Sequence, residues 1–433
     1  MSPSGSESID QLLTWGAEHN SNCIEDVEIY EDAVTGLSFK ATKSLPADSD
    51  IVNCSYQITL SYLNAIQSPG FLRRSEAFPI NFLKILGQDD PNVIGYFFLM
   101  QQYIMKEESF WWPYIQNLPQ PDNTQKLSVP VWWPEEDLKF LEGTNAGPPI
   151  QKRKDMWVAQ WNEAISLLQG KFADLESYTY ALFMWAATIF GSRSFRPSLT
   201  IAGGMFEDES QTQDHIRKDR FSILLPILDI GNHDGVNNVA WHPNKDTGLT
   251  FSNRTSISKG SQIYNFYGFK SNSELLVGYG FTLPRSSNGN FDGDSVNLKL
   301  KPSPQTVALR RQQKCHSVPV NLEEEFMYAV RKQDSKSTLP EFAHFPHGLL
   351  DVILAMIASQ REITIFWSSV KNRGYCAGVD LGLYSGPLYS KFFQLEVLGI
   401  WNYCTLWYKS PGHLGSLRIP KANPMQERVV LKV

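Results

Sequence analysis

The sequence LPILDIGNH at residues 225–233 is the stretch that decides how this chain is interpreted. It is an apolar run that ends in Asn-His. YNFYGFKSN (264–272) and GYGF (278–281) follow about thirty residues later. Short apolar runs between turn residues are typical of buried strands. An amide, an imidazole and several phenols at the ends of such strands predict that these side chains converge on one cleft.

In the N-terminal half, the spacing of apolar residues changes from a pattern typical of strands to one typical of helices near residue 78. After a polar tail of about eight residues, which we expect to be disordered, apolar spacing predicts a short helix over 9–20. Alternation predicts short strands and turns over 27–52, and helices are expected from about 78 to 190. Three of these helices are marked by aromatic or apolar residues at helical spacing: 95–103, 155–168 and 174–189. Most such aromatic residues are expected to pack in a core.

Strand texture returns in the second half of the chain. The polar segment 198–219 is interpreted as an exposed loop, and 284–294 as another loop rich in Gly, Ser and Asn. From about residue 305 the pattern is helical again. The strands expected here are 221–230, 248–252 and 262–267. This order indicates an α+β core with a helical insertion and a mostly helical C-terminal domain.

The composition of the 433-residue chain excludes several classes of protein. The net charge is −6, whereas nucleic-acid-binding proteins usually carry a basic face, so the charge argues against nucleic-acid binding. The five cysteines are scattered without a C-x-x-C pair, which argues against a thiolate zinc site and fits a reducing compartment. No secretory signal or membrane-length apolar run stands out. We therefore expect an intracellular monomer, cytoplasmic, nuclear or both, with neither nucleic acid nor membrane as partner.

The candidate functional residues each have a plain structural alternative. Asn232 could cap a turn and His233 could be a satisfied core group, or both could face a polar ligand. Asp229 could orient that turn or a ligand amine, or be a surface acid. Arg193 follows an apolar helix, where it could complement the helix dipole or clamp a carboxylate.

The tyrosines near residue 267 favour an aromatic channel. Tyr267 would serve as a protonated, hydrogen-bonding phenol, because its ordinary pKa lies near 10. Tyr264, Tyr279 and Phe281 surround it in sequence and could bind an ammonium group through ring faces. A metal site at His344 and His347 is disfavoured, because Phe-Pro separates the two histidines and no Cys lies near them in sequence, and we expect no metal.

Taken together, these segments resemble the SET-domain protein methyltransferases, in the branch of the Rubisco large-subunit lysine methyltransferase and the actin-histidine methyltransferase. The resemblance covers about residues 20–300 and is ordered as in that branch. Its motifs here are Gly36 to Thr42, FWWPYI (110–115), Ser192-Arg193, DIGNH (229–233) and YGFKSNSE (267–274). It implies a SET-type fold of short strands over 20–300, with a helical insertion at about 78–190. It also implies a helical C-terminal domain over 301–433 that binds substrate, preceded by a tail and short helix at 1–19.

The resemblance also implies a cofactor and residue roles. S-adenosylmethionine would be held by Arg193, Asn232 and His233, with Phe281 packing near its adenine. Tyr267 corresponds to the catalytic tyrosine of the family. Tyr279 corresponds to a wall of the substrate channel, and Tyr264 is assigned to the same channel. The activity implied is methyl transfer to a protein or peptide, with lysine the favoured acceptor and histidine an alternative.

Three departures from the family pattern leave a different function open. Lys40 stands where many members have an arginine that contacts the cofactor carboxylate, and Ser38 replaces the second glycine of the opening motif. An acidic cofactor-contacting residue of some relatives falls at Leu63. Lys40 remains a predicted cofactor contact. The alternative is a catalytically silent SET-fold module that binds a peptide in its aromatic groove.

Overall fold

The computed structural model describes residues 5–68, 70–72, 76–206, 209–235, 238–283, 295–301, 303–304 and 327–331. The chain divides into two compact units. The first comprises Met1–Phe140 and Ala146–Leu283, and the second comprises Leu141–Asn145 and Pro284–Val433. None of the helices in the described ranges has the length and apolarity that a membrane crossing needs.

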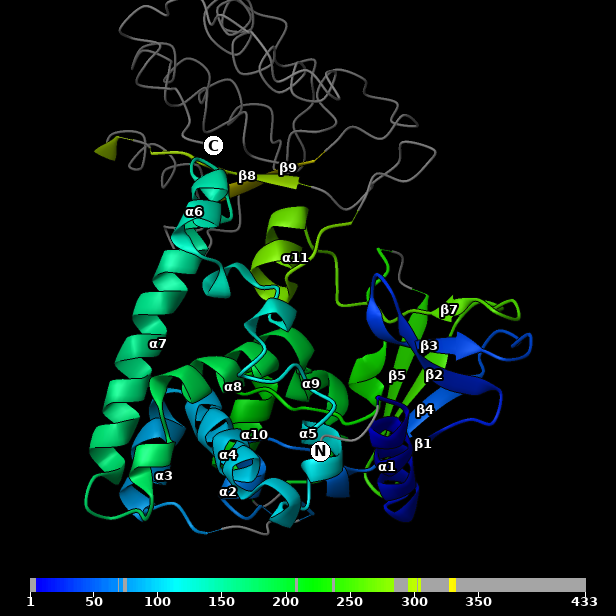
Figure 1. Cartoon of the computed structure of the whole chain (residues 1–433), viewed down its shortest axis with the longest axis horizontal. Coiled ribbons are helices and arrows are strands. Elements are labelled where there is room, and N and C mark those ends of the chain that lie inside the picture. Colours follow the sequence, from blue (N-terminus) through cyan, green and yellow to red (C-terminus); the bar gives the residue numbers. More distant parts are fainter. Residues whose placement is uncertain are drawn as a thin grey trace, which may run out of the picture. The chain divides into compact units, whose positions relative to one another are not determined.

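Two small antiparallel sheets form one side of the first unit (Figure 1). The larger sheet has the strand order β1-β4-β6-β5, and its members are β1 (Asn22–Cys23), β4 (Asp50–Cys54), β6 (Gly248–Asn253) and β5 (Val239–Asn244). The smaller has the order β2-β3-β7, built from β2 (Val27–Asp32), β3 (Gly36–Ala41) and β7 (Gln262–Ile263). The predicted strands over 27–52 and 248–252 are confirmed. β3 pairs with β7 through Phe39 and Ile263, which ties the two ends of the unit together.

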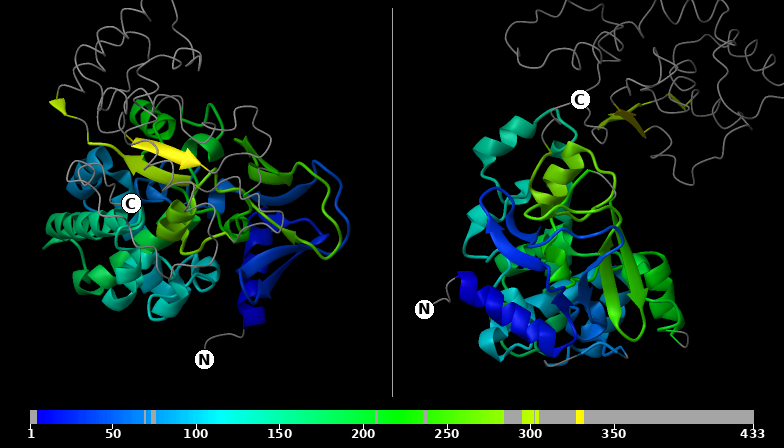
Figure 2. Two further views of the ribbon diagram at one scale, coloured as in Figure 1. Left: turned by 90° about the horizontal axis from the view of Figure 1, so that it is seen from above. Right: turned by 90° about the vertical axis from the view of Figure 1, so that its right-hand side faces the viewer.

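Most helices of the first unit gather to one side of these sheets, while the first helix (Gly5–Glu18) lies beside the strands (Figures 1 and 2). The α-helices are α1 (Gly5–Glu18), α2 (Tyr62–Ala65), α3 (Ile80–Asp89), α4 (Pro91–Met105), α5 (Trp112–Ile115), α6 (Glu135–Leu138), α7 (Gly147–Leu168), α8 (Tyr180–Arg193), α9 (Pro197–Thr200), α10 (Ser210–Arg217) and α11 (Asn272–Tyr279). Single 3-10 turns are η1 (Tyr56–Ile58), η2 (Lys106–Glu108), η3 (Thr124–Lys126), η4 (Pro130–Trp132), η5 (Lys139–Leu141), η6 (Leu175–Ser177) and η7 (Leu228–Ile230). The predicted helical insertion is therefore confirmed.

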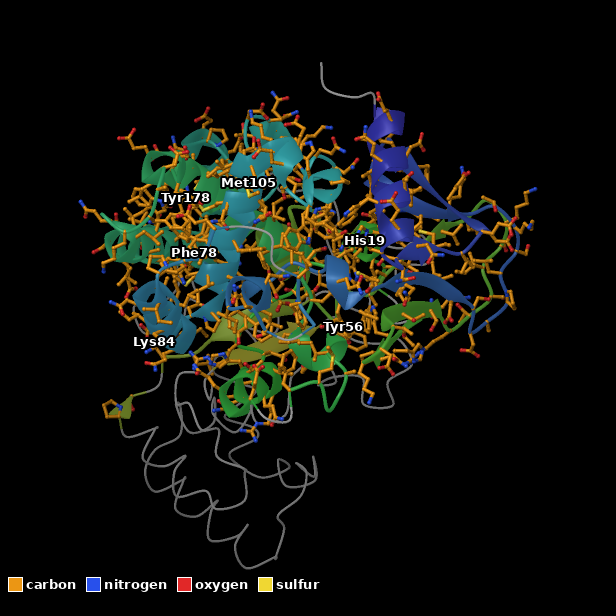
Figure 3. The ribbon with its side chains drawn as sticks, turned by 90° about the horizontal axis from the view of Figure 1, so that it is seen from below. His19, Tyr56, Phe78, Lys84, Met105 and Tyr178 are labelled. Carbon is orange, nitrogen blue, oxygen red and sulfur yellow. The ribbon has the colours of Figure 1, made fainter. Side chains whose placement is uncertain are left out.

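Aromatic residues fill the core of the helical side, as their spacing predicts. Trp111 and Trp185 are fully buried, and their indole N–H groups donate to the carbonyl oxygens of Ile58 and Pro119 at 2.9 and 2.7 Å. The hydrogen bond to that single polar group offsets the cost of removing it from water. Figure 3 shows Phe78, Met105 and Tyr178 on the helical side, and His19 and Tyr56 at its junction with the strands.

The first helix begins earlier than predicted. It begins at Gly5, within the polar residues expected to be disordered, and its apolar face buries Leu12 and Trp15. This packing against the core explains why residues of low hydrophobicity are helical, since tertiary contacts stabilise a helix more than propensity does.

The segment 198–219 is not the exposed loop that its polarity predicts. It contains part of α9 and all of α10, and Thr212 and His215 are buried. The ring of His215 lies against Tyr62, with 3.2 Å between its Nδ1 and the phenol oxygen. The prediction failed because a polar segment can bury two residues that find hydrogen-bond partners.

The predicted strand over 221–230 is also wrong. Only isolated bridges form, Phe195 with Ile223 and Leu60 with Leu224. Pro226 has no N–H to continue a ladder, and Ile227 has a φ of 70°, which turns the chain into η7. The run is apolar because it is a buried irregular segment. Likewise β7 ends at Ile263, short of the predicted 267.

Helix α11 was not predicted, although its N-terminal signal is present in the sequence. Ser271 and Glu274 form a capping box, in which the Ser271 hydroxyl accepts from the Glu274 N–H and the Glu274 carboxylate accepts from the Ser271 N–H. Gly280 ends the helix with a φ of 81°, a left-handed conformation that glycine adopts readily.

The described strands of the second unit form a two-stranded antiparallel sheet. β8 (Ser295–Lys299) pairs antiparallel with β9 (Met327–Arg331). β9 is a strand where the sequence predicts helix. The other helices predicted beyond residue 305, and the loop predicted at 284–294, lie outside the described residues.

Candidate active site

The two sequence segments that flank the candidate site are joined directly. Asn232 and His233 follow η7, and His233 forms a parallel bridge with Asn265. The Asn265 N–H donates to the Asn232 carbonyl at 2.7 Å, and the Asp234 N–H donates to the Asn265 carbonyl at 3.0 Å. This short parallel pairing places Asn-His beside the tyrosine that comes two residues after Asn265.

Four aromatic rings form a cluster around Tyr267. The imidazole of His233 stacks on the Tyr267 ring with 5.0 Å between centroids, and the Tyr279 ring lies 4.9 Å from the Tyr267 ring. Phe281 is 6.2 Å from Tyr279 and 6.3 Å from His233. The ammonium of Lys270 lies 5.6 Å from the Tyr279 ring centre, which shows that this aromatic surface accepts a cation. Tyr267, Tyr279 and Phe281 therefore come together as the sequence predicts.

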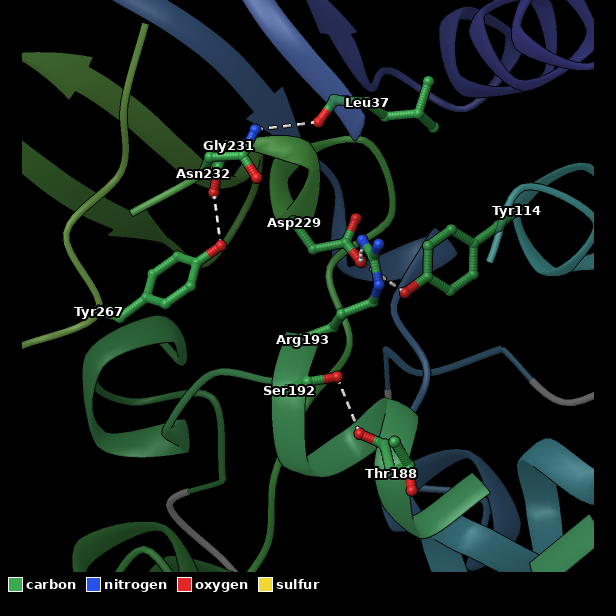
Figure 4. Close-up of polar contacts among 9 residues, drawn as sticks. All are labelled: Leu37, Tyr114, Thr188, Ser192, Arg193, Asp229, Gly231, Asn232 and Tyr267. Carbon is green, nitrogen blue, oxygen red and sulfur yellow. Dashed lines mark hydrogen bonds and ion pairs between the residues drawn. The ribbon is translucent and has the colours of Figure 1, made fainter. Parts of the chain in front are cut away.

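The phenol of Tyr267 is held in a defined orientation. Its O–H donates to the Gly231 carbonyl oxygen at 2.9 Å (Figure 4). Burial raises the pKa of Tyr267, and the Arg193 charge opposes that shift. The phenol therefore stays protonated at neutral pH, and its remaining lone pairs are available to a ligand.

His233 is neutral and its tautomer is fixed. Burial lowers the pKa of His233 to about 4. The Nδ1 atom accepts the backbone N–H of Tyr267 at 3.1 Å, so the proton of the neutral ring resides on Nε2. The imidazole thus acts as a structural acceptor on one side and a potential donor on the other.

The side chain of Asn232 links the site to strand β3. Its side-chain nitrogen donates to the Leu37 carbonyl at 3.1 Å (Figure 4). The same nitrogen donates to the Ser38 hydroxyl at 2.7 Å. Ser38, which replaces a glycine of the family pattern, is fully buried and supplies one of these acceptors. The amide is half-buried, so it could also meet a ligand.

Arg193 and Asp229 form an ion pair in which the aspartate is buried. Arg193 is the last residue of α8, and its Nη1 lies 3.4 Å from Oδ2 of Asp229. The Asp229 side chain is 1% exposed, so it is not a surface acid. The Tyr114 phenol donates to the same Oδ2 at 2.8 Å (Figure 4). Burial raises the pKa of Asp229, and the charge of Arg193 opposes that shift.

Two of the predicted site residues have other surroundings. Lys40 forms an ion pair with Glu28, and its ammonium lies 4.7 Å from the Tyr30 ring centre. Tyr264 is 39% exposed, and its ring makes none of the ring contacts of the Tyr267 cluster in the described chain. Leu63, where some relatives carry an acid, is fully buried in α2 and offers no polar group.

Metal ligands are not grouped in the described ranges. No set of three or more His, Cys, Asp or Glu side chains lies there in a position to hold an ion. Cys23 and Cys54 are free thiols. His344, His347 and the other three cysteines lie outside the described residues.

Sequence reasoning missed two participants in the site. Tyr114 enters it only as a letter of the motif FWWPYI, and its contact with Asp229 spans 115 residues of sequence. The Gly231 carbonyl, which receives the Tyr267 phenol, has no sequence signal, because a backbone acceptor carries no residue identity. The Tyr114 signal was a hydroxyl within an otherwise apolar segment, since a buried phenol needs a partner.

Comparison of the structure with solved structures defines the class of fold. The structure of Rubisco LSMT bound to AdoMet matches with a TM-score of 0.58 and 18% identity, covering 84% of this chain and 73% of that chain. The SET domain of LSMT bound to lysine and AdoHcy matches with a TM-score of 0.57 and 18% identity, covering 81% and 70%. The chain therefore has the SET-domain fold, and the predicted α+β class is confirmed.

Sequence comparison then gives the particular relatives. The ribosomal lysine N-methyltransferase set10 of Schizosaccharomyces pombe is 29% identical over 264 residues, 60% of this chain and 42% of the relative. The human actin-histidine N-methyltransferase is 22% identical over 294 residues, 67% and 44% of the two chains. No protein-family model matches the chain. The resemblance to SET-domain methyltransferases is confirmed, and the chain spans about half the length of the curated relatives it matches.

Proposed function

We propose that this protein is an S-adenosylmethionine-dependent protein N-methyltransferase, with lysine as the favoured acceptor. The observation that carries the proposal is the Tyr267 cluster, in which a fixed phenol lies between His233 and Tyr279 in a SET fold. Relatives named as ribosomal lysine and actin-histidine methyltransferases support it. A structural neighbour bound to lysine and AdoHcy supports the choice of lysine and cofactor.

The residues at the site suit such a cofactor. Arg193 contacts Asp229 through one nitrogen, so the rest of its fork could bind a ligand carboxylate. Asn232 and His233 provide an amide and an imidazole for the polar groups of the amino-acid end. Phe281 provides a ring face for an adenine. Lys40 is paired with Glu28, so a contact between Lys40 and the cofactor would require that pair to open.

The reaction needs positioning more than acid-base strength. When bound, the cofactor would supply a sulfonium methyl group, and the acceptor nitrogen would have to lose its proton before it could take that group. At pH 7 on the order of one lysine in a thousand is neutral. Loss of water from the channel, beside the positive charge of the cofactor, would favour the neutral amine. Tyr267 is too weak an acid to ionise, so it orients the amine through its phenol oxygen.

Two alternatives rest on specific observations. The actin-histidine relatives favour a histidine acceptor as the second candidate. A silent peptide-binding module is motivated by Lys40, which is paired, and by Leu63, which is buried without a polar group. We further propose a protein or peptide as substrate, with the protein acting as an intracellular monomer. Light scattering of the purified full chain checks its oligomeric state.

The decisive experiment is calorimetric titration with S-adenosylmethionine, beside the variant Asn232→Ala. Saturable binding that the variant loses supports the cofactor site. If a folded wild-type protein does not bind S-adenosylmethionine, the result favours the catalytically silent peptide-binding module. Hydrolysis of protein labelled by a radioactive methyl group then separates methyl-lysine from methyl-histidine.

Tyr267→Phe tests the assigned catalytic residue. We expect methyl transfer to fall at least tenfold, in line with the 10²- to 10³-fold that one positioned hydrogen-bonding group can contribute to a rate. The variant should remain folded, because it loses one hydrogen bond worth about 1 kcal/mol. Unchanged turnover would remove Tyr267 from the catalytic role. A circular dichroism spectrum identical to that of the wild type is the control.

A further inference from the structure

Asp229, Arg193 and Tyr114 form a polar group in the interior of the first unit. Tyr114 is the member of this group that comes from helix α5. It is 2% exposed and reaches Asp229 from a helix that carries none of the other candidate site residues. Its phenol donates to Oδ2 at 2.8 Å, and Arg193 approaches the same oxygen at 3.4 Å (Figure 4). One carboxylate oxygen therefore serves two partners.

The contacts around this carboxylate are unequal. Oδ1 of Asp229 is buried and has no hydrogen-bond partner in the described chain. Arginine and aspartate commonly pair through two parallel hydrogen bonds, which would use both carboxylate oxygens and both arms of the guanidinium. Here Arg193 makes a single, long contact through Nη1, and its side chain remains 26% exposed. Arg193 and Asp229 therefore do not form the pair of parallel hydrogen bonds that would satisfy both side chains.

We propose that Tyr114 is a positioning residue, whose phenol holds Asp229 turned away from two-pronged pairing so that Arg193 presents its fork to the carboxylate of a ligand. This inference rests on the proposed function, because it assigns that carboxylate to the amino-acid end of the cofactor. Asp229 retains enough contact to fix the place of the guanidinium. Tyr114 limits that contact by occupying the Oδ2 lone pair that faces α5.

The electrostatics of the group agree with this division of roles. Burial and the negative charge of Asp229 raise the pKa of Tyr114, so the phenol keeps the proton that it donates. Without that donor, Asp229 would retain Arg193 as its sole polar partner among the described side chains. A buried carboxylate gains most from a second hydrogen bond to the same guanidinium, so we expect the pair to close.

The test is the selectivity of Tyr114→Phe for ligands with and without a carboxylate. S-adenosylhomocysteine and its decarboxylated analogue are each titrated into wild-type and variant full-length protein by calorimetry. We expect Kd for S-adenosylhomocysteine to rise about tenfold in the variant, the size of a lost charge-assisted hydrogen bond. Kd for the decarboxylated analogue should change less than about twofold, because that ligand makes no use of the guanidinium fork.

The matched control is Tyr62→Phe. That residue is similarly buried, its phenol lies 3.2 Å from Nδ1 of His215, and its ring contacts are with His215 and Phe221, neither of which is a candidate site residue. The control should leave both Kd values unchanged. If Tyr114→Phe is too unstable for calorimetry, the rise in Tm that each ligand produces provides the same comparison.

The outcomes separate this inference from the proposed function. An equal loss for both ligands means that Tyr114 is merely structural, and equal affinity in wild type and variant means that it does not position Arg193; either result overturns the inference while the cofactor site stands. A wild-type protein that binds neither ligand refutes the cofactor assignment, and the inference with it.

Discussion

Gly280 offers a perturbation whose cost can be derived from the structure. It ends α11 with a φ of 81° and separates Tyr279 from Phe281 in the aromatic cluster. A Cβ at this position would lie 2.6 Å from the Ser128 carbonyl carbon and 2.8 Å from the Val129 nitrogen. Both are backbone atoms, which cannot rotate away. Gly280→Ala therefore combines an unfavourable backbone conformation with a steric overlap.

The two effects can be estimated separately. A non-glycine residue in the left-handed region costs about 1–2 kcal/mol, and overpacking against a fixed neighbour costs about 1–3 kcal/mol. The loss of unfolded-state freedom returns roughly 0.4–1 kcal/mol. We therefore expect Gly280→Ala to lower the free energy of unfolding by about 2–4 kcal/mol.

Alanine substitutions at two neighbouring glycines separate the cost of the backbone conformation from the cost of the steric overlap. Gly268 has a φ of 100° but no atom within 4 Å of its added Cβ, so Gly268→Ala should cost only about 1 kcal/mol. Gly278 lies inside α11 with no such φ and no close atom, so Gly278→Ala should stabilise by up to about 1 kcal/mol. Urea unfolding of the three variants measures the series. If Gly280→Ala is as harmless as Gly278→Ala, the argument from backbone overlap is wrong.

Two further predictions concern the same region. Ser271→Ala removes the capping box of α11 and should cost about 1 kcal/mol in urea unfolding; a stability equal to wild type would mean that the cap is dispensable. His233 has a pKa of about 4 when folded and an ordinary value of 6.5. The unfolded chain therefore binds more protons between these values, and the stability contributed by neutral His233 is complete above pH 6.5 and lost as the pH falls toward 4. The free energy of unfolding measured from about pH 7 to about pH 4 should fall more steeply for wild type than for His233→Gln, and parallel curves would contradict the assignment.

Local sequence signals determined a substantial part of this protein. Alternation over residues 27–52 predicts short strands, which include β2, β3 and β4. Helical spacing over 155–168 and 174–189 predicts helices that overlap α7 and α8, because these patterns match the geometry of a strand and of a helix. The ordered motifs at 229–233 and 267–274 carry the SET-domain resemblance. Those motifs alone predict that Asn232, His233 and Tyr267 lie in one cluster.

Only the tertiary structure decided what lies between these signals. The run ending at Ile230 is as apolar as a strand, yet Pro226 and the turn at Ile227 make it a buried irregular segment. Tyr114 and Asp229 lie 115 residues apart, and nothing local to either residue specifies the other. Propensity and periodicity report on neighbours along the chain. The partners of a buried polar group are set by packing between distant segments, so the sequence determined which groups enter the site, and the fold decided how they pair.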